Sequence, residues 1–137
     1  MSKNVVTVGL DESLRAIKEI FDQGKIHHLL VEEDKQLYGV ISDRDLWQAI
    51  SPYLGTSFES VRDTATLNKR AHHIMTRKPI SLYKEADIFE AIRIFNQHRI
   101  SCIPIVTSEQ HIVGIITWRD IFRLLETDRE ALCRAPG

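Results

Sequence analysis

Two kinds of apolar pattern alternate along this chain of 137 residues. In one kind, apolar residues recur every three or four positions, which predicts helices with one buried face. In the other, they form short and almost continuous runs, which predicts buried strands. The order strand, helix, strand, strand, helix occurs in the first half and again in the second. We therefore expect a mixed α/β fold of two β-α-β-β-α repeats packed with pseudo-two-fold symmetry.

The first repeat begins with a short extended segment and continues into a helix, which we expect Asp11 to cap and Gly24 to end. The buried face of this helix is predicted to consist of Leu14, Ile17, Ile20 and Phe21. Two strands follow, at His28–Val31 and Leu37–Ser42. A short helix closes the repeat with the apolar residues Leu46, Trp47 and Ile50.

The second repeat has the same order, displaced by 74 or 75 positions. Its first helix is expected to bury Ile88, Ile92 and Phe95, with Phe89 beside them. The strands are expected at Cys102–Val106 and Ile112–Thr117. A last helix contains Ile121, Leu124 and Leu125, and we expect these three residues, like the three apolar residues of the first closing helix, to be exposed at an interface.

Between the repeats, Pro52 and Gly55 interrupt the chain, and Thr56 with Glu59 forms a capping-box pattern that predicts a linker helix. The predicted division is a first repeat at 1–55, a linker helix at 56–74, a second repeat at 75–127 and a flexible tail at 128–137. The first repeat has no leading helix. Either the protein begins at its Met-Ser pair, or a preceding part belongs to it.

One motif occurs at the end of the second strand in each repeat: a glycine, two β-branched residues, a hydroxyl residue and an aspartate three positions later. The two copies are Gly39-Val-Ile-Ser-Asp-Arg-Asp45 and Gly114-Ile-Ile-Thr-Trp-Arg-Asp120. This pattern predicts a strand that leads directly into a helix, with the hydroxyl at the N-cap and the aspartate in the first turn. One interpretation is a capping box, in which both side chains bind only backbone N–H groups. The duplication favours an additional, functional role.

Composition excludes several classes of protein. The apolar fraction of 43% and the charged fraction of 27% are those of a globular protein, and the net charge of −1 gives no reason to expect nucleic-acid binding. No apolar run is long enough to cross a membrane, and no signal peptide is visible, so we expect neither membrane insertion nor export from the cytoplasm. Cys102 and Cys133 lack the spacing of a disulfide framework or a zinc site.

Metal binding and catalysis also find little support. The pairs His27-His28 and His72-His73 have no third ligand at a useful spacing, so no metal site is expected. The sequence lacks a nucleophile elbow, a P-loop, a dinucleotide fingerprint and a metalloprotease signature, so we do not expect an enzyme. Trp47 and Trp118, near the starts of the two closing helices, are expected to anchor the core or an interface.

From Met1 to about Glu126 the sequence resembles the tandem CBS-domain pair, or Bateman module. The resemblance rests on Met-Ser or Met-Thr at the head of each repeat, on Ile103-Pro-Ile-Val106 and on the two Gly…Asp motifs. The first repeat departs from the pattern at Leu30, where the second has Pro104. The family implies regulation by adenosine-containing ligands (AMP, ADP, ATP or, in some members, S-adenosylmethionine), which act as regulatory ligands and not as catalytic cofactors.

The resemblance also implies roles for particular residues. Asp45 and Asp120 would each accept hydrogen bonds from the ribose hydroxyls of one ligand, and Ser42 and Thr117 would lie near its phosphate. Adenine would lie between apolar strand residues of the opposite repeat, so that the Asp120 site is lined by Val6 and Ile26 and the Asp45 site by Ile80 and Ile100.

A phosphate anchor is implied by a second resemblance. His98-Arg99 is similar to a His-Arg pair that contacts phosphates in the gamma subunit of AMP-activated protein kinase. The alternative is that Arg99 is a solvated cation at a helix end. The first repeat has Gly24-Lys25 instead, and lysine keeps the charge but loses the bidentate geometry.

The sequence therefore leads us to expect one function and to keep one alternative. The first is a ligand-sensing regulatory module that binds an adenine nucleotide in the cleft between the repeats and acts on an effector protein or an output domain. The alternative is a dimerisation or interaction scaffold that binds no nucleotide. In either case a homodimer is expected, as is common in the family.

Overall fold

The computed structural model describes residues 5–127, which divide into two compact units. The N-terminal unit comprises residues 6–79, and the C-terminal unit comprises residues 80–127 together with Val5. Each unit contains its own sheet and its own buried cluster, and each is described separately below. Predictions about the tail, including Cys133, lie outside the described residues.

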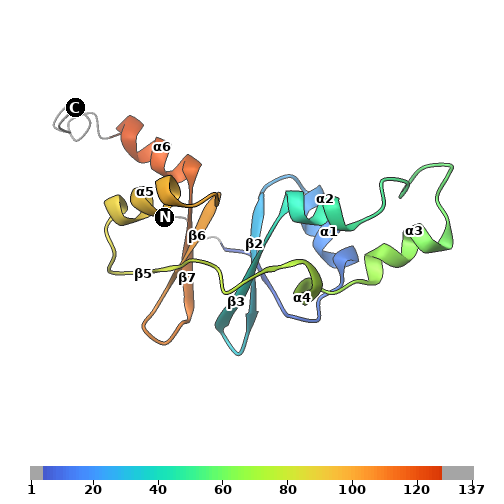
Figure 1. The fold of residues 1–137 in the computed structure, drawn as a ribbon, viewed down its shortest axis with the longest axis horizontal. Coiled ribbons are helices and arrows are strands. Elements are labelled where there is room, and N and C mark those ends of the chain that lie inside the picture. Colours follow the sequence, from blue (N-terminus) through green and yellow to red (C-terminus); the bar gives the residue numbers. More distant parts are fainter. Residues whose placement is uncertain (1–4, 128–137) are drawn as a thin grey trace. The chain divides into compact units, whose positions relative to one another are not determined.

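The N-terminal unit is built on a four-stranded sheet in the order β1-β2-β3-β4 (Figure 1). Strand β1 pairs in parallel with β2, whereas β2 with β3 and β3 with β4 are antiparallel. The strands are Thr7–Val8, His28–Glu33, Gln36–Ser42 and Thr76–Arg77. The helices are α1 at Leu14–Asp22, α2 at Asp43–Ala49, α3 at Val61–Ala65, the 3-10 helix η1 at Thr66–Asn68 and α4 at Ala71–Ile74.

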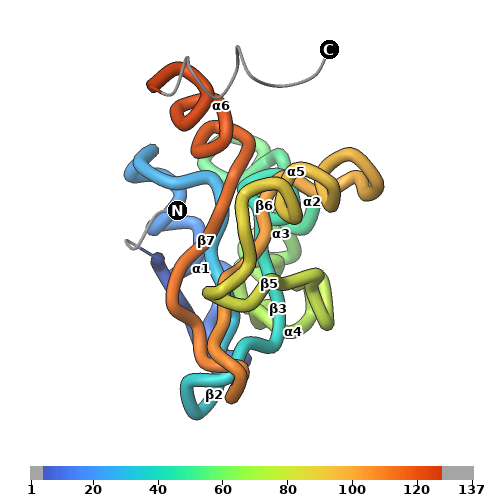
Figure 2. The backbone as a smooth tube through the Cα atoms, turned by 90° about the vertical axis from the view of Figure 1, so that its left-hand side faces the viewer, coloured from blue at the N-terminus to red at the C-terminus, as the bar shows by residue number. Residues whose placement is uncertain are grey.

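The C-terminal unit has a three-stranded sheet in the order β5-β6-β7, with β5 parallel to β6 and β6 antiparallel to β7. Its strands are Leu82–Tyr83, Cys102–Val106 and Ile112–Thr117, and its helices are α5 at Ile88–Gln97 and α6 at Trp118–Thr127. Strand β7 runs into α6 without a connecting loop (Figure 2). The predicted order strand, helix, strand, strand, helix is therefore confirmed in both units.

The apolar periodicity identified most of the core, and Phe89 is the exception among the residues named for the first helix of each repeat. Leu14, Ile17 and Phe21 of α1 are buried, with Ile20 packed against them. All five residues of β6 are buried, as a continuous apolar run predicts for a central strand covered on both faces. In α5, Phe95 is buried with Ala91, whereas Phe89 remains 66% exposed.

The helix α1 begins two residues later than predicted. Its N-cap is Ser13, whose Oγ accepts a hydrogen bond from the backbone N–H of Ala16 at 3.3 Å, and the prediction for Asp11 was wrong. Backbone hydrogen bonds hold the preceding segment extended: Leu14 donates to Lys69 at 2.9 Å, and Ala71 donates to Glu12 at 2.8 Å. This long-range pairing leaves no room for a helical turn before Leu14.

The linker also differs from the prediction, because it contains three short helices in place of one. The capping box lies at Ser60 and Asp63, whereas Thr56 donates to the carbonyl of Tyr53 at 2.6 Å in a preceding turn. Side-chain bonds of this kind compete with helix formation. Hydrogen bonds from Ser51 and from Ser60 lower the pKa of the Asp63 carboxyl.

The expected exposure of the closing helices was wrong for several residues. Leu46, Ile50 and Ile121 are buried within their own units. Trp47 at 50% and Leu124 at 42% are exposed as expected, and Phe122 at 60% and Trp118 at 43% are exposed as well. Helical periodicity identifies the apolar residues, but the neighbouring strands decide which of them face the core.

Strand β4 shows why a glycine opens the repeated motif. By sequence, Thr76 belongs to the head of the second repeat, but it pairs with Val40 of β3 in the N-terminal unit. A Cβ atom on Gly39 would come within 2.6 Å of the Met75 sulfur and 2.9 Å of the Thr76 carbonyl oxygen. The glycine therefore allows β4 to approach β3.

We expect Gly39→Ala to destabilise the chain by about 1–3 kcal/mol, because the Met75 side chain can turn aside but the β4 backbone must shift. Chemical denaturation measures this change. Gly9→Ala is the matched control, since nothing lies within 4 Å of the added methyl group and little change is expected. Equal stability of the two variants would contradict the packing role.

His28, the first residue of β2, has a clearly shifted pKa. Burial lowers its pKa below the usual 6.5, and His27 contributes in the same direction. The carboxylates of Asp43 and Asp45 act in the opposite direction but do not compensate for burial. The folded chain therefore disfavours the protonated form of His28.

This shift predicts a loss of stability in acid. As the pH falls through about 6.5, the unfolded state takes up a proton on His28 before the folded state does, so the free energy of unfolding decreases. Denaturation between pH 8 and pH 5 should show a smaller loss for His28→Gln than for the wild type. His98→Gln, at an exposed position, is the control and should retain the wild-type profile. Identical profiles for all three proteins would refute the prediction.

Candidate functional site

The motif at the end of β3 forms a corner between this strand and α2, which we call the N-terminal corner (Ser42 to Asp45). The backbone N–H of Ser42 donates to Oδ2 of Asp45 at 2.9 Å, and the backbone N–H of Asp45 donates to Oγ of Ser42 at 3.1 Å. These two reciprocal bonds make a complete capping box. Both side chains are partly exposed.

The C-terminal corner (Thr117 to Asp120) repeats this geometry between β7 and α6. The backbone N–H of Thr117 donates to Oδ2 of Asp120 at 2.9 Å, and the backbone N–H of Asp120 donates to Oγ1 of Thr117 at 3.4 Å. The threonine hydroxyl also donates to Oδ2 of Asp120 at 3.2 Å. The structural interpretation of the motif is therefore correct at both corners.

Capping occupies only one oxygen of each carboxylate. Among residues 5–127, Oδ1 of Asp45 and Oδ1 of Asp120 accept no hydrogen bond. An ionised carboxylate has about four lone-pair directions, so each aspartate keeps acceptor capacity. The bond to the backbone meanwhile fixes the orientation of the side chain. Each corner can thus stabilise its helix and still accept hydrogen bonds from a ligand.

The two corners differ at the residue that follows the hydroxyl. In the N-terminal corner this residue is Asp43, whose Oδ2 lies 2.9 Å from Nδ1 of His27. The Asp43 backbone N–H also donates to the carbonyl of His27 at 2.9 Å. The segment that leads into β2 is therefore held to the start of α2 by an acidic side chain and by the backbone.

In the C-terminal corner the corresponding residue is Trp118. Its Nε1 donates to the carbonyl of Ile100 at 3.3 Å, and its ring packs near those of Phe95 and Phe122, with centroids 5.3 and 6.1 Å apart. The segment containing Arg99 and Ile100 is thereby held beside α6. The predicted anchoring role of Trp118 agrees with these contacts, although the side chain remains 43% exposed.

The other predicted site residues divide between the units. Val6 and Ile26 are partly buried against the N-terminal core, and Ile100 is partly buried against the C-terminal core. Ile80 is partly exposed at the start of the C-terminal unit. The predicted pairing of these residues with corners of the opposite repeat stays a prediction.

The His-Arg pair lies at the end of α5. His98 is the C-cap of this helix, and both His98 and Arg99 are exposed. No hydrogen bond or ion pair to the Arg99 side chain is found among the described residues. Arg99 is therefore available to a ligand, but it also fits the alternative of a solvated cation.

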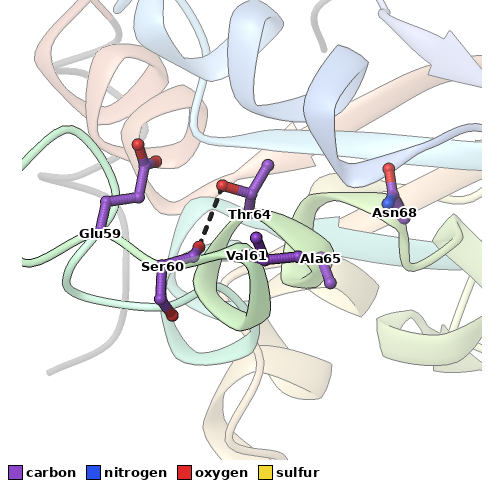
Figure 3. A pocket seen from close by; sticks show the side chains of 6 residues that line it. All are labelled: Glu59, Ser60, Val61, Thr64, Ala65 and Asn68. Carbon is purple, nitrogen blue, oxygen red and sulfur yellow. Dashed lines mark hydrogen bonds between the residues drawn. The ribbon is translucent and has the colours of Figure 1, made fainter.

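Outside the corners, the features of residues 5–127 relevant to ligand binding are possible metal ligands and a surface depression. No group of three His, Cys, Asp or Glu side chains within this range is placed to hold a metal ion. An open depression of about 520 Å³ runs along α3 (Figure 3) and is lined by Glu59, Ser60, Val61, Thr64, Ala65 and Asn68. None of these residues belongs to a corner, and Val61 is 88% exposed, so the depression is shallow.

Two contacts near the corners were not anticipated from the sequence. The first is the pairing of Asp43 with His27, and the second is the hydrogen bond from Trp118 to Ile100. The only signal in the sequence was that Asp43 and Trp118 occupy equivalent positions of the repeat, 75 residues apart.

Within residues 5–127, no helix is long and apolar enough to cross a membrane.

Comparison with known proteins gives consistent results. The chain is 29% identical over 127 residues to a CBS domain-containing protein of Dictyostelium discoideum, covering 91% of this chain and 87% of that protein. The crystal structure of a CBS domain pair in complex with 5′-methylthioadenosine and S-adenosyl-L-methionine is 25% identical, with a TM-score of 0.75 and coverage of 93% of both chains.

A third relative is much longer than this chain. Inosine-5′-monophosphate dehydrogenase of Halobacterium salinarum is 30% identical over 127 residues, but the match covers 90% of this chain and only 22% of the enzyme. The family model for the CBS domain matches residues 1–50 and 71–127, which include both corners. The chain belongs to the CBS domain family, and it contains two copies of the repeat.

Proposed function

We propose that this chain is a regulatory module that senses an adenosine-containing ligand through its two corners. The observation that carries the proposal is the duplicated aspartate that is fixed by a capping box and retains a free carboxylate oxygen. A preorganised charged acceptor loses little side-chain entropy on binding, and its hydrogen bonds to hydroxyl groups are of the stronger, charge-assisted kind.

In this proposal Asp45 and Asp120 accept hydrogen bonds from the ribose hydroxyls, and Ser42 and Thr117 lie near the 5′ group. Arg99, with His98 beside it, is the proposed phosphate anchor. The adenine is proposed to contact apolar residues at strand ends, namely Val6, Ile26, Ile80 and Ile100. Support comes from the related CBS pair, whose two ligands, 5′-methylthioadenosine and S-adenosylmethionine, both contain adenosine.

The first test is the melting temperature of the full chain with AMP, ADP, ATP and S-adenosylmethionine. A ligand that binds only the folded state at 100 times its dissociation constant adds about 2.7 kcal/mol of stability. For a domain of this size the melting temperature should rise by roughly 5–10 °C. If none of the four ligands at millimolar concentration raises it, the scaffold function is favoured.

The second test separates capping from ligand binding. Asp120→Asn can still accept the Thr117 N–H, so we expect it to fold with nearly unchanged stability. It replaces the free carboxylate oxygen with an amide, which should weaken ligand binding by about ten- to a hundredfold. Isothermal titration calorimetry measures the affinity. Asp45→Asn should have the same effect on a ligand at the N-terminal corner.

A matched control uses the ligand. A 2′,3′-dideoxy analogue should bind the wild type weakly and lose little more with Asp120→Asn, because the interaction is already missing. Asp120→Ala should be less stable than the wild type and than Asp120→Asn, since it also removes the cap, which costs about 0.5–2 kcal/mol of stability. If both Asn variants bind as tightly as the wild type, the aspartates are only caps.

The scaffold function is favoured by a different observation. Helices α5 and α6 of the C-terminal unit expose Phe89 at 66%, Phe122 at 60% and Leu124 at 42%. Large exposed apolar side chains are typical of interaction sites when they form a patch. We therefore also propose a homodimer, which is compatible with either function, and an effector protein or output domain as the regulated partner.

Light scattering at tens of micromolar should give twice the mass of one chain. Replacing both Phe89 and Phe122 by serine should shift the mass towards that of the monomer, because the apolar surface available for association decreases. Tyr53→Ser is the control, since Tyr53 is also exposed at 53% but lies after α2 in the N-terminal unit. A monomeric wild type would contradict the homodimer.

A further inference from the structure

The two corners provide a controlled comparison within one molecule. The Asp45 and Asp120 carboxylates make the same bond to the backbone N–H of the hydroxyl residue, at 2.9 Å in both cases. The second residue after the hydroxyl residue is an arginine in both corners, namely Arg44 and Arg119. The two corners therefore have the same proposed ribose-binding groups and the same nearby cation. They differ in the residue between the hydroxyl residue and the arginine.

That residue changes the local charge. The N-terminal corner has two carboxylates, Asp43 and Asp45, with one guanidinium, whereas the C-terminal corner has one carboxylate and one guanidinium. The segments before β2 and β6 do not remove this difference, because each contributes one cation, Lys25 or Arg99. One additional negative charge therefore remains at the N-terminal corner.

The orientation of Asp43 keeps this charge at the corner. Its carboxylate is 2.9 Å from Nδ1 of His27, and its own backbone N–H binds the His27 carbonyl. The side chain is thus held at the start of α2, next to Ser42, and is 38% exposed. In the C-terminal corner, the equivalent position is filled by the uncharged indole of Trp118, which is held by Ile100 and by two aromatic rings.

We propose that Asp43 makes the two corners selective for different adenosyl ligands: the N-terminal corner for ligands with an uncharged or cationic 5′ group, and the C-terminal corner for those with a 5′ phosphate. This inference rests on the proposed function of the corners. A carboxylate beside the hydroxyl residue repels a phosphate dianion and attracts a sulfonium or ammonium group. A neutral indole with Arg99 nearby allows the phosphate.

The test uses two ligands that share adenosine and differ in the 5′ group, AMP and 5′-methylthioadenosine. Calorimetry at pH 8 keeps the phosphate of AMP doubly charged. In the Asp120→Asn background, where the N-terminal corner dominates binding, methylthioadenosine should bind more tightly than AMP. In the Asp45→Asn background the preference should be for AMP.

The decisive variant is Asp43→Asn, added to the Asp120→Asn background. It removes the charge but keeps the backbone bond to His27, and AMP affinity should rise by roughly three- to tenfold. Methylthioadenosine affinity should change by less than about twofold, because an uncharged 5′ group does not sense the carboxylate. Asp34→Asn is the control, since the β2–β3 turn is at the opposite end of the hairpin from the corner.

Salt provides an independent measurement that needs no variant of Asp43. The N-terminal corner has as many cations (Lys25, Arg44) as carboxylates (Asp43, Asp45), so raising NaCl from 50 to 500 mM should change AMP binding there only slightly. At the C-terminal corner the same change should weaken AMP binding, because attraction to Arg99 and Arg119 is screened. We therefore expect a clear loss of AMP affinity with salt in the Asp45→Asn background and a much smaller change in the Asp120→Asn background.

The outcomes distinguish this inference from the proposed function. If both ligands bind but AMP shows equal affinity for the two corners, or Asp43→Asn changes both ligands equally, the selectivity is overturned and the adenosyl function stands. If neither ligand binds the wild type, both proposals fall. A selective gain for AMP in Asp43→Asn, with none in Asp34→Asn, supports the inference.

Discussion

The reciprocal bond between a strand end and a helix start is the interaction on which both candidate sites depend. When a strand leads directly into a helix, the first N–H groups of the helix have no partner of their own. In both units, a carboxylate binds the N–H of the hydroxyl residue at 2.9 Å, and the hydroxyl accepts the N–H of that aspartate. The bond that stabilises the corner also orients the acceptor that a ligand would meet.

This shared geometry explains why the motif alone could not decide between structure and function. A capping aspartate and a ligand-binding aspartate require the same residue at the same spacing. The structure shows the capping role and is compatible with the proposed second one, because Oδ2 is occupied in both corners while Oδ1 accepts no bond among the described residues. Gly39 is different: contacts with Met75 and Thr76 account for it without any ligand.

Duplication has preserved the corners more closely than their surroundings. Asp43 and Trp118 occupy equivalent positions, and each holds the segment that leads into β2 or β6 of its own unit, but one does so with a charge and the other with an indole N–H. The same backbone framework therefore presents two chemically different surfaces. In a regulatory module this difference would allow one chain to respond to two related ligands.

The sequence by itself determined the order of elements, the bounds of β6 and β7 to the residue and the buried face of α1, because these follow from local periodicity. It also identified the two corners. Only the tertiary structure decided where α1 begins, because the pairing of residues 10–14 with 69–72 joins segments far apart in the chain. The partners of Asp43 and Trp118 were likewise unpredictable, since the backbone carbonyls and side chains that they bind become neighbours only when the strands pair.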